Sequence, residues 1–586
     1  MILERIKHPR ELKSLSYGEL GSLSSEMREA LLKKLSAHGG HLGSNLGIVE
    51  VTVALHYTFD SPKDKIVFDV SHQSYSHKML TGRAEAFLYS DKYDTVSGYS
   101  APDESEHDFF TMGHTSTSVS LCLGLAKARD LLGEDSHIIA VIGDGSLSGG
   151  EALEALNYAG EFNGRLIILV NDNDMSIAEN HGGMYEGLKL LRDTKGKAQS
   201  NIFKDFGLEY MYVDEGNDIE ALVNAFEAAK SYTRPVVVHV KTKKGKGYSF
   251  AESERESWHA TPPFDLESGE RLFDKNSDRS YANLTANHLL EKMKADKSIV
   301  SITAATPTVA GFSEDKRAIA GAQFIDVGIA EENALAMASG IAKGGAKPVW
   351  AVNSTFLQRT YDQMSHDVCL NSTPVTTVVF ASSIFCGSDV THIGLYDIPM
   401  LSSIPRLKYL APTCKEEYLA MLDWSIEQRD YPVAIKIPGK EYTLSGKTPR
   451  EDYSNCEYEI CKSGEDVAIL ALGSFYQIGQ ETCKLLSENG INATLINPLF
   501  ISETDERTLE ALKSNHKLVI TLEDGILDGG FGEKIARFYG NCSMRVLCYG
   551  FKKEFPFHYT VDEILKENRI SAPQITEDAL SVLKNG

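Results

Sequence analysis

The sequence predicts an α/β fold built from several doubly wound units, because short apolar runs alternate along it with segments of helical periodicity. Most runs end in Gly, Asp, Asn or Ser, which is typical of buried parallel strands whose carboxyl ends carry functional loops. The clearest apolar runs are residues 137–145, 165–174, 234–242, 347–354, 374–382, 466–474, 492–499 and 517–525. Helical periodicity is clearest at residues 24–39 and 117–133.

Two polar, charged stretches without periodicity interrupt this pattern, at residues 251–281 and 439–455. Their composition predicts linkers. They divide the chain into three domains, expected at residues 1–275, 276–443 and 444–586. Each is of ordinary domain size and long enough to bury its own core.

The composition restricts the partners that we expect. The 586 residues include 59 Lys+Arg and 82 Asp+Glu, giving a net charge of −23, which disfavours nucleic acid and anionic membranes. The nine cysteines form no C-x-x-C pair and indicate reduced thiols. The amino terminus lacks the apolar segment of a signal peptide, and no run is long enough to span a membrane. We therefore expect a cytoplasmic protein with small-molecule substrates.

A candidate metal motif follows two consecutive predicted strands. Asp144 lies in Gly143-Asp144-Gly145 after the first strand, and Asn173 follows the second. Neighbouring strand ends would bring their oxygens together, and Mg²⁺ prefers such ligands. A simple strand-to-helix turn is the alternative, and a phosphatase- or polymerase-like site would need more carboxylates. The motif resembles the thiamine diphosphate (ThDP) fingerprint, which implies that Asp144, the Asn173 side chain and the Met175 carbonyl bind Mg²⁺.

Longer stretches resemble the 1-deoxy-D-xylulose-5-phosphate synthase family. SHQSYSHKMLTGR (71–83) and STFLQRTYDQ (354–363) are specific to that family rather than to transketolases in general. The other matching stretches are residues 40–47, 49–83, 104–130, 242–248, 324–342 and 354–368, and the third domain resembles the transketolase C-terminal domain. The resemblance implies a transketolase-like ThDP fold: a diphosphate-binding domain, an aminopyrimidine-binding domain and a C-terminal domain, in a homodimer.

The resemblance also implies a reaction. ThDP and Mg²⁺ would support the decarboxylation of pyruvate and its joining to D-glyceraldehyde 3-phosphate, giving 1-deoxy-D-xylulose 5-phosphate and CO₂ for isoprenoid, thiamine and pyridoxal synthesis. The alternative is a paralogous carboligase or transketolase that uses another aldehyde, phosphorylated or not. A third hypothesis is a regulatory protein that retains ThDP. The intact candidate residues described below argue against it.

Glu331 is the residue that the resemblance places against N1′ of the cofactor, where a carboxylate favours the imino tautomer that deprotonates the thiazolium. By itself, a glutamate here would be interpreted as a helix first-turn residue stabilised by the dipole. The resemblance implies that the catalytic residues are Glu331, His41, His72, His259, His392 and Asp389. It implies cofactor contacts from His72, Gly113, His114, Thr115, Gly145, Ser146, Asn173, Glu331 and Phe356.

Histidine suits proton transfer near neutral pH, but any one of the 17 histidines is more often a surface or core residue. That simpler interpretation is preferred for His56, His137 and His239. Arg359 is also interpreted as structural. For the acidic residue near His392, the alignment leaves Ser388 or Asp389, and we choose Asp389.

The acceptor-phosphate site of the family is not preserved. Ala381-Ser382 stand where the family has Asp-Arg, Gly439 where it has Arg, and Asn353 where it has Tyr. Arginine binds phosphate oxygens bidentately, and neither Ala nor Ser replaces it. Either Lys436 or Lys440 compensates, or the acceptor has changed. The sequence favours neither.

Two further features of the sequence lie in the first and third domains. Residues 180–206 are shorter than is usual in the family and rich in Gly and Lys, which predicts a mobile flap near the site. The third-domain glycines suit a turn into a helix and dimer packing. They are Gly525, Gly529, Gly530 and Gly532.

Overall fold

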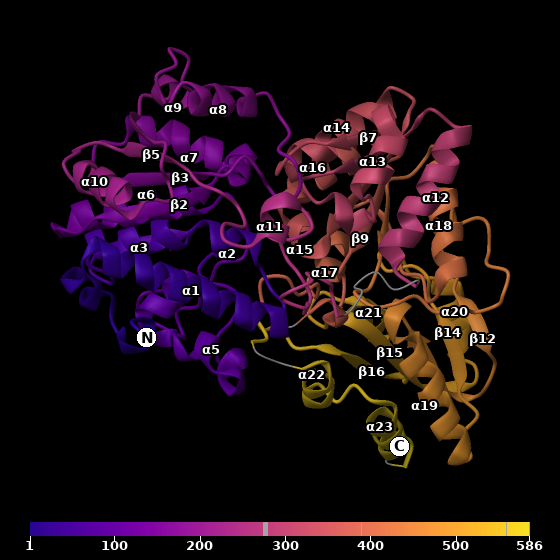
Figure 1. Ribbon diagram of the computed structural model, residues 1–586. Coiled ribbons are helices and arrows are strands. Elements are labelled where there is room, and N and C mark those ends of the chain that lie inside the picture. Colours follow the sequence, from indigo (N-terminus) through magenta and orange to yellow (C-terminus); the bar gives the residue numbers. More distant parts are fainter. Residues whose placement is uncertain (273–278, 388, 558–559, 585–586) are drawn as a thin grey trace. The chain divides into compact units, whose positions relative to one another are not determined.

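The computed structural model describes residues 1–272, 279–387, 389–557 and 560–584 (Figure 1). The chain forms two compact units. Unit 1 comprises Met1–Lys275 and Val327–Ala330, and unit 2 comprises Asn276–Asp326 and Glu331–Gly586. Each unit is described by itself.

Unit 1 contains one parallel sheet of five strands in the order β1-β2-β3-β5-β4. The strands are β1 (Lys65–Phe68), β2 (Ile138–Gly143), β3 (Ile167–Asp172), β4 (Glu209–Val213) and β5 (Val236–Lys241). Successive residues of β2 belong to different hydrophobic clusters: Ile139 and Val141 to one, Ala140 and Ile142 to the other. The sheet is therefore covered on both faces, as the doubly wound prediction requires.

The helices of unit 1 begin and end at local signals. Helix α1 starts after a capping box of Ser16 and Glu19 and stops at Gly39, whose φ is 78°. The helices are α1 (Tyr17–His38), α2 (Gly43–Gly47), α3 (Val49–Thr58), α4 (Tyr75–Lys78), α5 (Glu85–Leu88), α6 (Ser118–Leu132), α7 (Gly150–Glu161), α8 (Met184–Asp193), α9 (Ile202–Asp205), α10 (Ile219–Ala229) and α11 (Ser249–Ser253). The carboxyl ends of β2 and β3 carry the predicted metal motif.

The first predicted linker is largely folded. Residues 251–272 pack within unit 1, whereas 273–278 lie outside the described residues. Gly40 and Thr261 exchange backbone hydrogen bonds of 2.8 and 2.9 Å, and Trp258 is buried. The polar composition of this segment predicted a linker, but a few buried aromatic residues hold it in place. Among them are Trp258 and Phe264, whose ring centroids lie 4.8 Å apart.

Unit 2 begins with a six-stranded parallel sheet in the order β10-β11-β9-β8-β6-β7. Its strands are β6 (Ile299–Thr303), β7 (Phe324–Asp326), β8 (Lys347–Asn353), β9 (Thr376–Phe380), β10 (Lys408–Leu410) and β11 (Val433–Lys436). Its helices are α12 (Tyr281–Ala295), α13 (Glu314–Ala320), α14 (Glu331–Lys343), α15 (Ser354–Leu357), α16 (Tyr361–Gln363), α17 (Asp397–Ser402) and α18 (Lys415–Glu427).

The second sheet of unit 2 has the order β12-β14-β13-β15-β16, in which only the edge strand β12 is antiparallel to its neighbour. The strands are β12 (Glu459–Lys462), β13 (Asp466–Ala471), β14 (Thr494–Asn497), β15 (His516–Ile526) and β16 (Arg545–Phe551). The helices are α19 (Tyr476–Glu488), α20 (Glu506–Leu512), α21 (Phe531–Tyr539), α22 (Val561–Glu567) and α23 (Ala572–Lys584). The two sheets of unit 2 are joined by an isolated bridge between Leu410 and Phe500.

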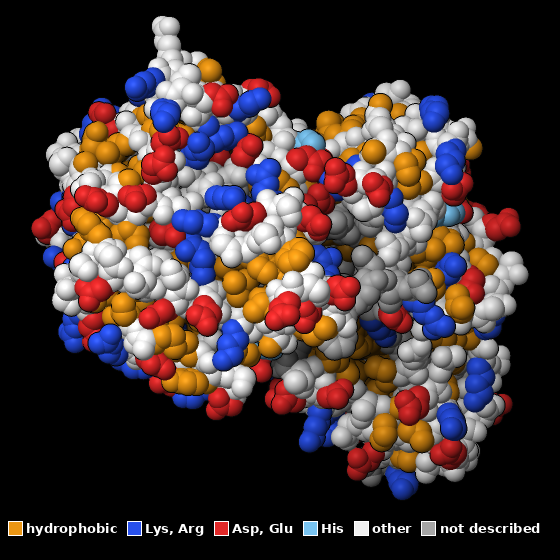
Figure 2. All heavy atoms as spheres, viewed as in Figure 1, with side chains coloured by type: hydrophobic (Ala, Val, Ile, Leu, Met, Phe, Trp, Pro, Cys, Tyr) orange, Lys and Arg blue, Asp and Glu red, His pale blue; other side chains and the backbone are white. Residues whose placement is uncertain are grey.

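The surface carries both signs of charge. On the face that Figure 2 shows, acidic and basic side chains are interspersed over the indigo-to-magenta part of the chain. Among the described residues, no helix is long and apolar enough to cross a membrane.

Candidate active site

Asp144 follows β2, and its carboxylate is buried. Its Oδ2 accepts hydrogen bonds from the Met175 backbone N–H at 3.1 Å and from the Asn180 amide at 2.7 Å. Burial and the neighbouring Asp172 carboxylate raise the pKa of Asp144 to about 7. An ionised carboxylate in such surroundings is costly unless a cation lies against it.

Asn173 lies beside Asp144 because β2 and β3 are adjacent and parallel, with Gly143 opposite Asn171. The Asn173 backbone N–H is 3.5 Å from Asp144 Oδ1. Its side-chain Oδ1 is shielded from solvent and has no hydrogen-bond partner among the described residues. The structure thus brings together Asp144, Asn173 and Met175, and it leaves a buried oxygen of the kind that Mg²⁺ binds.

The other two aspartates of this region are paired elsewhere. Asp172 accepts from Arg192 and from His239, both at 2.8 Å, and Asp174 pairs with Arg192 at 2.5 Å. Burial would raise the pKa of Asp172, but His239 and Arg192 outweigh it and lower that pKa. Their pairing leaves Asp144 as the carboxylate that faces Asn173, which disfavours the carboxylate-rich phosphatase alternative.

The predicted mobile flap, residues 180–206, contains the helices α8 and α9, and its mobility stays a prediction. Much of the segment is helical, because Leu188 and Leu191 of α8 are fully buried in the core. The Tyr185 hydroxyl donates to the Asp144 backbone carbonyl at 3.2 Å. The Gly- and Lys-rich composition hid an amphipathic helix that supports the metal motif.

Lys244 is a buried cation beside this motif, in the stretch 242–248. Its Nζ donates to the carbonyl oxygen of Ser176. Burial lowers the pKa of Lys244 to about 7, and the charge of Asp144 opposes that shift. The Lys244 amine is therefore a candidate to bind an anion, because a negative charge beside it would favour its protonated form.

The two predicted cofactor loops of unit 1 meet at Ser116. Residues 113–115 precede a turn in which Asp69 accepts from the backbone N–H of Ser116 at 2.8 Å and of Ser118 at 3.0 Å. Ser116 has a φ of 74°, and its hydroxyl donates to the Ser146 carbonyl at 2.9 Å. The structure thereby places the Gly113-His114-Thr115 loop beside Gly145-Ser146.

Three predicted catalytic histidines form a cluster in unit 1. The ring centroids of His41 and His72 are 5.1 Å apart, those of His41 and His259 are 5.7 Å apart, and those of His72 and His259 are 5.2 Å apart. Burial, Lys244 and the two other histidines lower the pKa of His259 well below its usual value. His259 is therefore neutral at physiological pH and acts as a hydrogen-bonding group rather than as a cation.

Asn45 is a buried residue that holds two of these histidine loops together. Its amide donates to the backbone carbonyl of His41 at 2.7 Å and of His72 at 2.8 Å, and its oxygen accepts from Tyr75 N–H at 3.0 Å. Ser44 Oγ lies 3.0 Å from His72 Nε2. Residues 40–47 were predicted only to match the family, and this role of Asn45 was not predicted. The available signal was an Asn between Gly43 and Gly47, within the short helix α2.

In unit 2, Glu331 opens α14 and is 4% exposed. Burial raises the pKa of its carboxyl group, and Arg359 opposes this shift from 3.4 Å. Arg359, expected to be structural, thus contacts the predicted catalytic carboxylate. A buried glutamate with one cationic neighbour retains an oxygen that can bind a polar ligand atom.

Phe356 and His392 also lie together in unit 2, with ring centroids 5.6 Å apart. Asp389 Oδ1 is 3.6 Å from His392 Nδ1 and accepts from Thr391 N–H at 2.8 Å. Burial would raise the pKa of Asp389, but His392 and Thr391 outweigh it and lower that pKa. Asp389 is therefore ionised and lies beside His392, whose Nδ1 is 2.8 Å from Thr391 Oγ1. The alternative Ser388 lies outside the described residues.

The predicted compensating cation Lys436 is neutralised within unit 2. Its Nζ donates to Asp397 at 2.9 and 3.1 Å and to Ser382 Oγ at 2.8 Å, and both charged side chains are buried. The Tyr409 hydroxyl donates to the same aspartate. Lys436 already has these hydrogen-bond partners, so its charge stabilises the buried Asp397 in the core.

Gly439, where the family has an arginine, has no space for a side chain. A Cβ there would lie 2.5 Å from Cys386 Cα. Lys440 donates to the Ser474 carbonyl at 3.2 Å and lies 4.3 Å from the Phe385 ring centroid. The backbone around Cys386 thus occupies the volume that an arginine side chain at position 439 would need.

Comparisons with known proteins agree over the whole chain. A family model described as 1-deoxy-D-xylulose-5-phosphate synthase matches residues 3–201 and 189–242. Models of the transketolase pyrimidine binding domain and C-terminal domain match residues 277–443 and 457–575. The 1-deoxy-D-xylulose-5-phosphate synthase of Caldanaerobacter subterraneus subsp. tengcongensis is 38% identical, covering 100% of this chain and 99% of that protein. The Clostridium acetobutylicum synthase is 39% identical, covering 96% and 97%.

The chain belongs to the 1-deoxy-D-xylulose-5-phosphate synthase family. Among solved structures, a Pichia stipitis transketolase complex with sedoheptulose-7-phosphate aligns at 17% identity over 97% of each chain, with a TM-score of 0.45. Membership of the family makes the enzyme a ThDP-dependent transferase with a transketolase-like α/β fold.

Proposed function

We propose that this enzyme decarboxylates pyruvate and joins the remaining two carbons to D-glyceraldehyde 3-phosphate, releasing CO₂ and 1-deoxy-D-xylulose 5-phosphate. The observation that carries the proposal is the identity of 37–39% to synthases over nearly the full length of both chains. The product would feed isoprenoid and thiamine synthesis. We further propose that the enzyme works as a cytoplasmic homodimer.

The residues present fit ThDP and Mg²⁺. Asp144, the unpartnered Oδ1 of Asn173 and the Met175 carbonyl supply oxygens for the metal. The loops at Gly113-His114-Thr115 and Gly145-Ser146 suit the diphosphate, since their backbones approach closely. When bound, the cofactor supplies a carbanion that attacks carbonyl carbon and a cationic ring that accepts electrons. Lys244 adds positive charge beside the phosphates.

Glu331 and Phe356 would hold the aminopyrimidine. Burial raises the pKa of Glu331, which favours a hydrogen bond shared between its carboxyl group and a ring nitrogen. Arg359 limits that rise and keeps the carboxyl group in place. Phe356 would pack against the ring. Glu331 would thereby favour the imino tautomer of the aminopyrimidine.

The histidines would handle protons on the substrates. His41 and His72, oriented through Asn45, suit hydrogen bonds to the hydroxyl and carbonyl oxygens of the reacting carbons. His259 is held neutral and accepts or donates a hydrogen bond without adding charge. In unit 2, His392 lies beside ionised Asp389, and Thr391 Oγ1 at 2.8 Å from His392 Nδ1 would help to hold its ring.

A second candidate acceptor is an aldehyde without phosphate. Lys436 is paired with Asp397, and Cys386 occupies the space beside Gly439, so two positions expected to bind phosphate lack an available cation. The acceptor phosphate should therefore contribute less to binding here than it would in a site with a pair of arginines.

The test measures CO₂ release and product formation with ThDP, Mg²⁺ and pyruvate, with D-glyceraldehyde 3-phosphate or D-glyceraldehyde as the acceptor. The first candidate predicts deoxyxylulose phosphate and a kcat/KM at least about tenfold higher for the phosphorylated acceptor. Equal or reversed values support the second candidate. No CO₂ release with either acceptor would refute both.

A further inference from the structure

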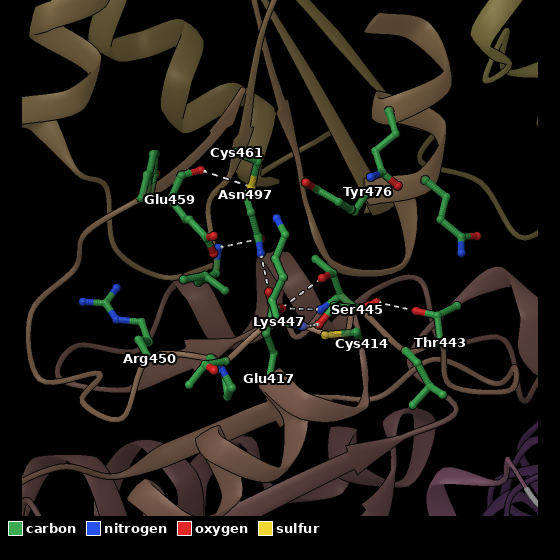
Figure 3. A pocket seen from close by; sticks show the side chains of 18 of the residues that line it. Cys414, Glu417, Thr443, Ser445, Lys447, Arg450, Glu459, Cys461, Tyr476 and Asn497 are labelled. Atoms are coloured by element: carbon green, nitrogen blue, oxygen red, sulfur yellow. Dashed lines mark hydrogen bonds between the residues drawn. The ribbon is translucent and has the colours of Figure 1, made fainter. Parts of the chain in front are cut away.

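A cavity of about 630 Å³ lies within unit 2, outside the residues assigned to the reaction above (Figure 3). Its walls come from the start of α18, the connection 443–450, strand β12 and the start of α19. Its volume is that of a typical small-molecule site. The second predicted linker thus forms a wall of a built cavity.

The cavity wall is fixed by hydrogen bonds. Glu416 accepts from the backbone N–H groups of Ser445 at 3.0 Å and Gly446 at 3.1 Å. Thr443 donates through its hydroxyl to the Thr413 carbonyl at 3.0 Å. The connection is therefore attached to the amino-terminal end of α18, and the cavity is preformed.

One part of the cavity is acidic and polar. Glu417 accepts from Thr413 N–H at 2.8 Å and from Asn497 Nδ2 at 3.0 Å, and Figure 3 marks the hydrogen bond to Asn497 with a dashed line. Burial raises the pKa of Glu417, and the nearby Glu459 adds to the rise. Two carboxylates that repel one another are stabilised by a donor or a cation placed between them.

Tyr453 supplies an independent sign of a ligand. Its side chain is 0% exposed, it lines the cavity, and its hydroxyl has no hydrogen-bond partner among the described residues. Burial raises the pKa of this hydroxyl, and the charge of Glu417 adds to the rise. A buried hydroxyl without a partner is costly, so a ligand atom that pairs with it gains affinity.

The other part is basic. A second, more open cavity of about 560 Å³ shares Lys447, Cys461, Tyr476 and Gln480 with the first and is therefore continuous with it. It adds Lys462 and Lys484, with Glu488 as its acidic member. Three lysines against one glutamate stand out in a chain of net charge −23.

The two parts have opposite preferences. A free phosphate would be repelled by Glu417 and Glu459, and a simple amine would be repelled by the lysines. A ligand that joins an amino-substituted ring to an anionic group satisfies both. Its amino group would donate to Glu417, its ring nitrogen would accept from Tyr453, and its anion would contact Lys447 and Lys462. The paired Arg450 and Glu457 close the rim, with 2.9 Å between Arg450 Nη1 and the Glu457 carbonyl.

We propose that this composite cavity binds an amino-substituted heteroaromatic monophosphate, with the ring among Glu417, Tyr453 and Tyr476 and the phosphate on Lys447, Lys462 and Lys484. The site is separate from the predicted ThDP-binding residues. Occupancy there would link the connection 443–450 to α18 and α19.

The experiment is isothermal titration calorimetry of AMP into the full-length enzyme saturated with ThDP and Mg²⁺. Adenosine and inorganic phosphate are titrated separately as the two halves of the probe. We expect AMP to bind at least about tenfold more tightly than either half, because both ends are recognised. No AMP binding, or AMP that is displaced by added ThDP, would overturn the proposal.

Two variants locate the site. Tyr453→Phe removes only the unpartnered hydroxyl and should weaken AMP and adenosine binding about fivefold. Lys462 lines the more open cavity, where a substitution should not disturb folding. Lys462→Gln should weaken AMP binding about fivefold and leave adenosine binding unchanged. Lys566→Gln, on exposed α22, is the matched control and should change neither. AMP binding that is undiminished in both Tyr453→Phe and Lys462→Gln would place it elsewhere and refute the assignment.

Discussion

Two polar regions of this enzyme, the metal motif of unit 1 and the Lys436 cluster of unit 2, use buried charge in opposite ways. At the metal motif, Asn173 Oδ1 has no hydrogen-bond partner among the described residues, and burial and Asp172 raise the pKa of Asp144 to about 7. In the Lys436 cluster, the lysine donates three hydrogen bonds to Asp397 and Ser382.

This difference distinguishes buried groups that bind a ligand from buried groups that stabilise the fold. A buried group that is left unsatisfied carries a free-energy cost that a ligand removes, whereas a buried pair is already compensated. Substitutions at the metal motif and at Glu331 should therefore affect ligand binding and turnover. Substitutions in the Lys436 cluster should affect the free energy of unfolding.

Glu331→Gln should have the largest effect. Glutamine keeps the shape but cannot share a proton with the cofactor ring, so kcat should fall about 10²- to 10⁴-fold. Circular dichroism should show an unchanged fold, because removing a buried carboxylate relieves desolvation. The measurement is CO₂ release from pyruvate at saturating ThDP. A variant with more than half of the original kcat would contradict the role of Glu331.

Lys436→Met should destabilise the enzyme without changing acceptor recognition. It leaves Asp397 buried without its cation, which costs about 3–5 kcal/mol of unfolding free energy. Urea unfolding measures the loss, and the double variant Lys436→Met/Asp397→Asn is the control that should recover most of it. A KM for the phosphorylated acceptor that rises tenfold in the stable double variant would show that Lys436 binds phosphate after all.

Asn173→Ala should weaken the metal site. Removing one of three protein oxygens should lower Mg²⁺ affinity about 10- to 100-fold in the presence of ThDP, with kcat recovering at high Mg²⁺. The unfolding free energy of the metal-free enzyme should stay within about 0.5 kcal/mol, since the Oδ1 atom has no protein partner to lose. Activity titrated against Mg²⁺ measures the first effect. An unchanged Mg²⁺ dependence would rule out Asn173 as a ligand.

These contrasts also show what the sequence could reveal. The neighbourhood of Asp144 and Asn173 was predictable, because consecutive parallel strands end side by side and both residues follow such strands. The pairing of Lys436 with Asp397 joins residues far apart in the chain, and no periodicity reports it. The packing of residues 251–272 onto unit 1 depends on a few aromatic contacts, which average composition obscures.

Asn45 illustrates an intermediate case. The sequence shows Asn45 within residues 40–45 (GHLGSN). Its role requires the backbone carbonyls of His41 and His72 to face one amide group. Such convergence comes from the tertiary fold and not from spacing. Helix α8 was not predicted for a related reason, since its two leucines are buried only because a core lies beneath them.

Glu523→Gln should give the smallest effect and extends the comparison to a buried carboxylate that accepts its hydrogen bonds from backbone N–H groups. Glu523 is fully buried and accepts from Phe531 and Gly532 N–H, both at 2.7 Å, yet burial raises its pKa to about 7. Because the folded-state pKa lies above the usual value of 4.5, the stabilising contribution is complete below pH 4.5 and is lost as the pH rises towards 7.

The variant should therefore lose less stability than the original enzyme between pH 5 and pH 7, by about 1–2 kcal/mol, because an amide does not ionise. Urea midpoints at pH 5, 6, 7 and 8 measure the difference. Asp528→Asn, at an exposed position in the loop that follows β15, is the control and should leave the pH profile unchanged. Parallel pH profiles for Glu523→Gln and the original enzyme would mean that the two backbone donors alone compensate the charge. Buried charge would then be costly at the metal motif because donors are too few there, and not because of burial as such.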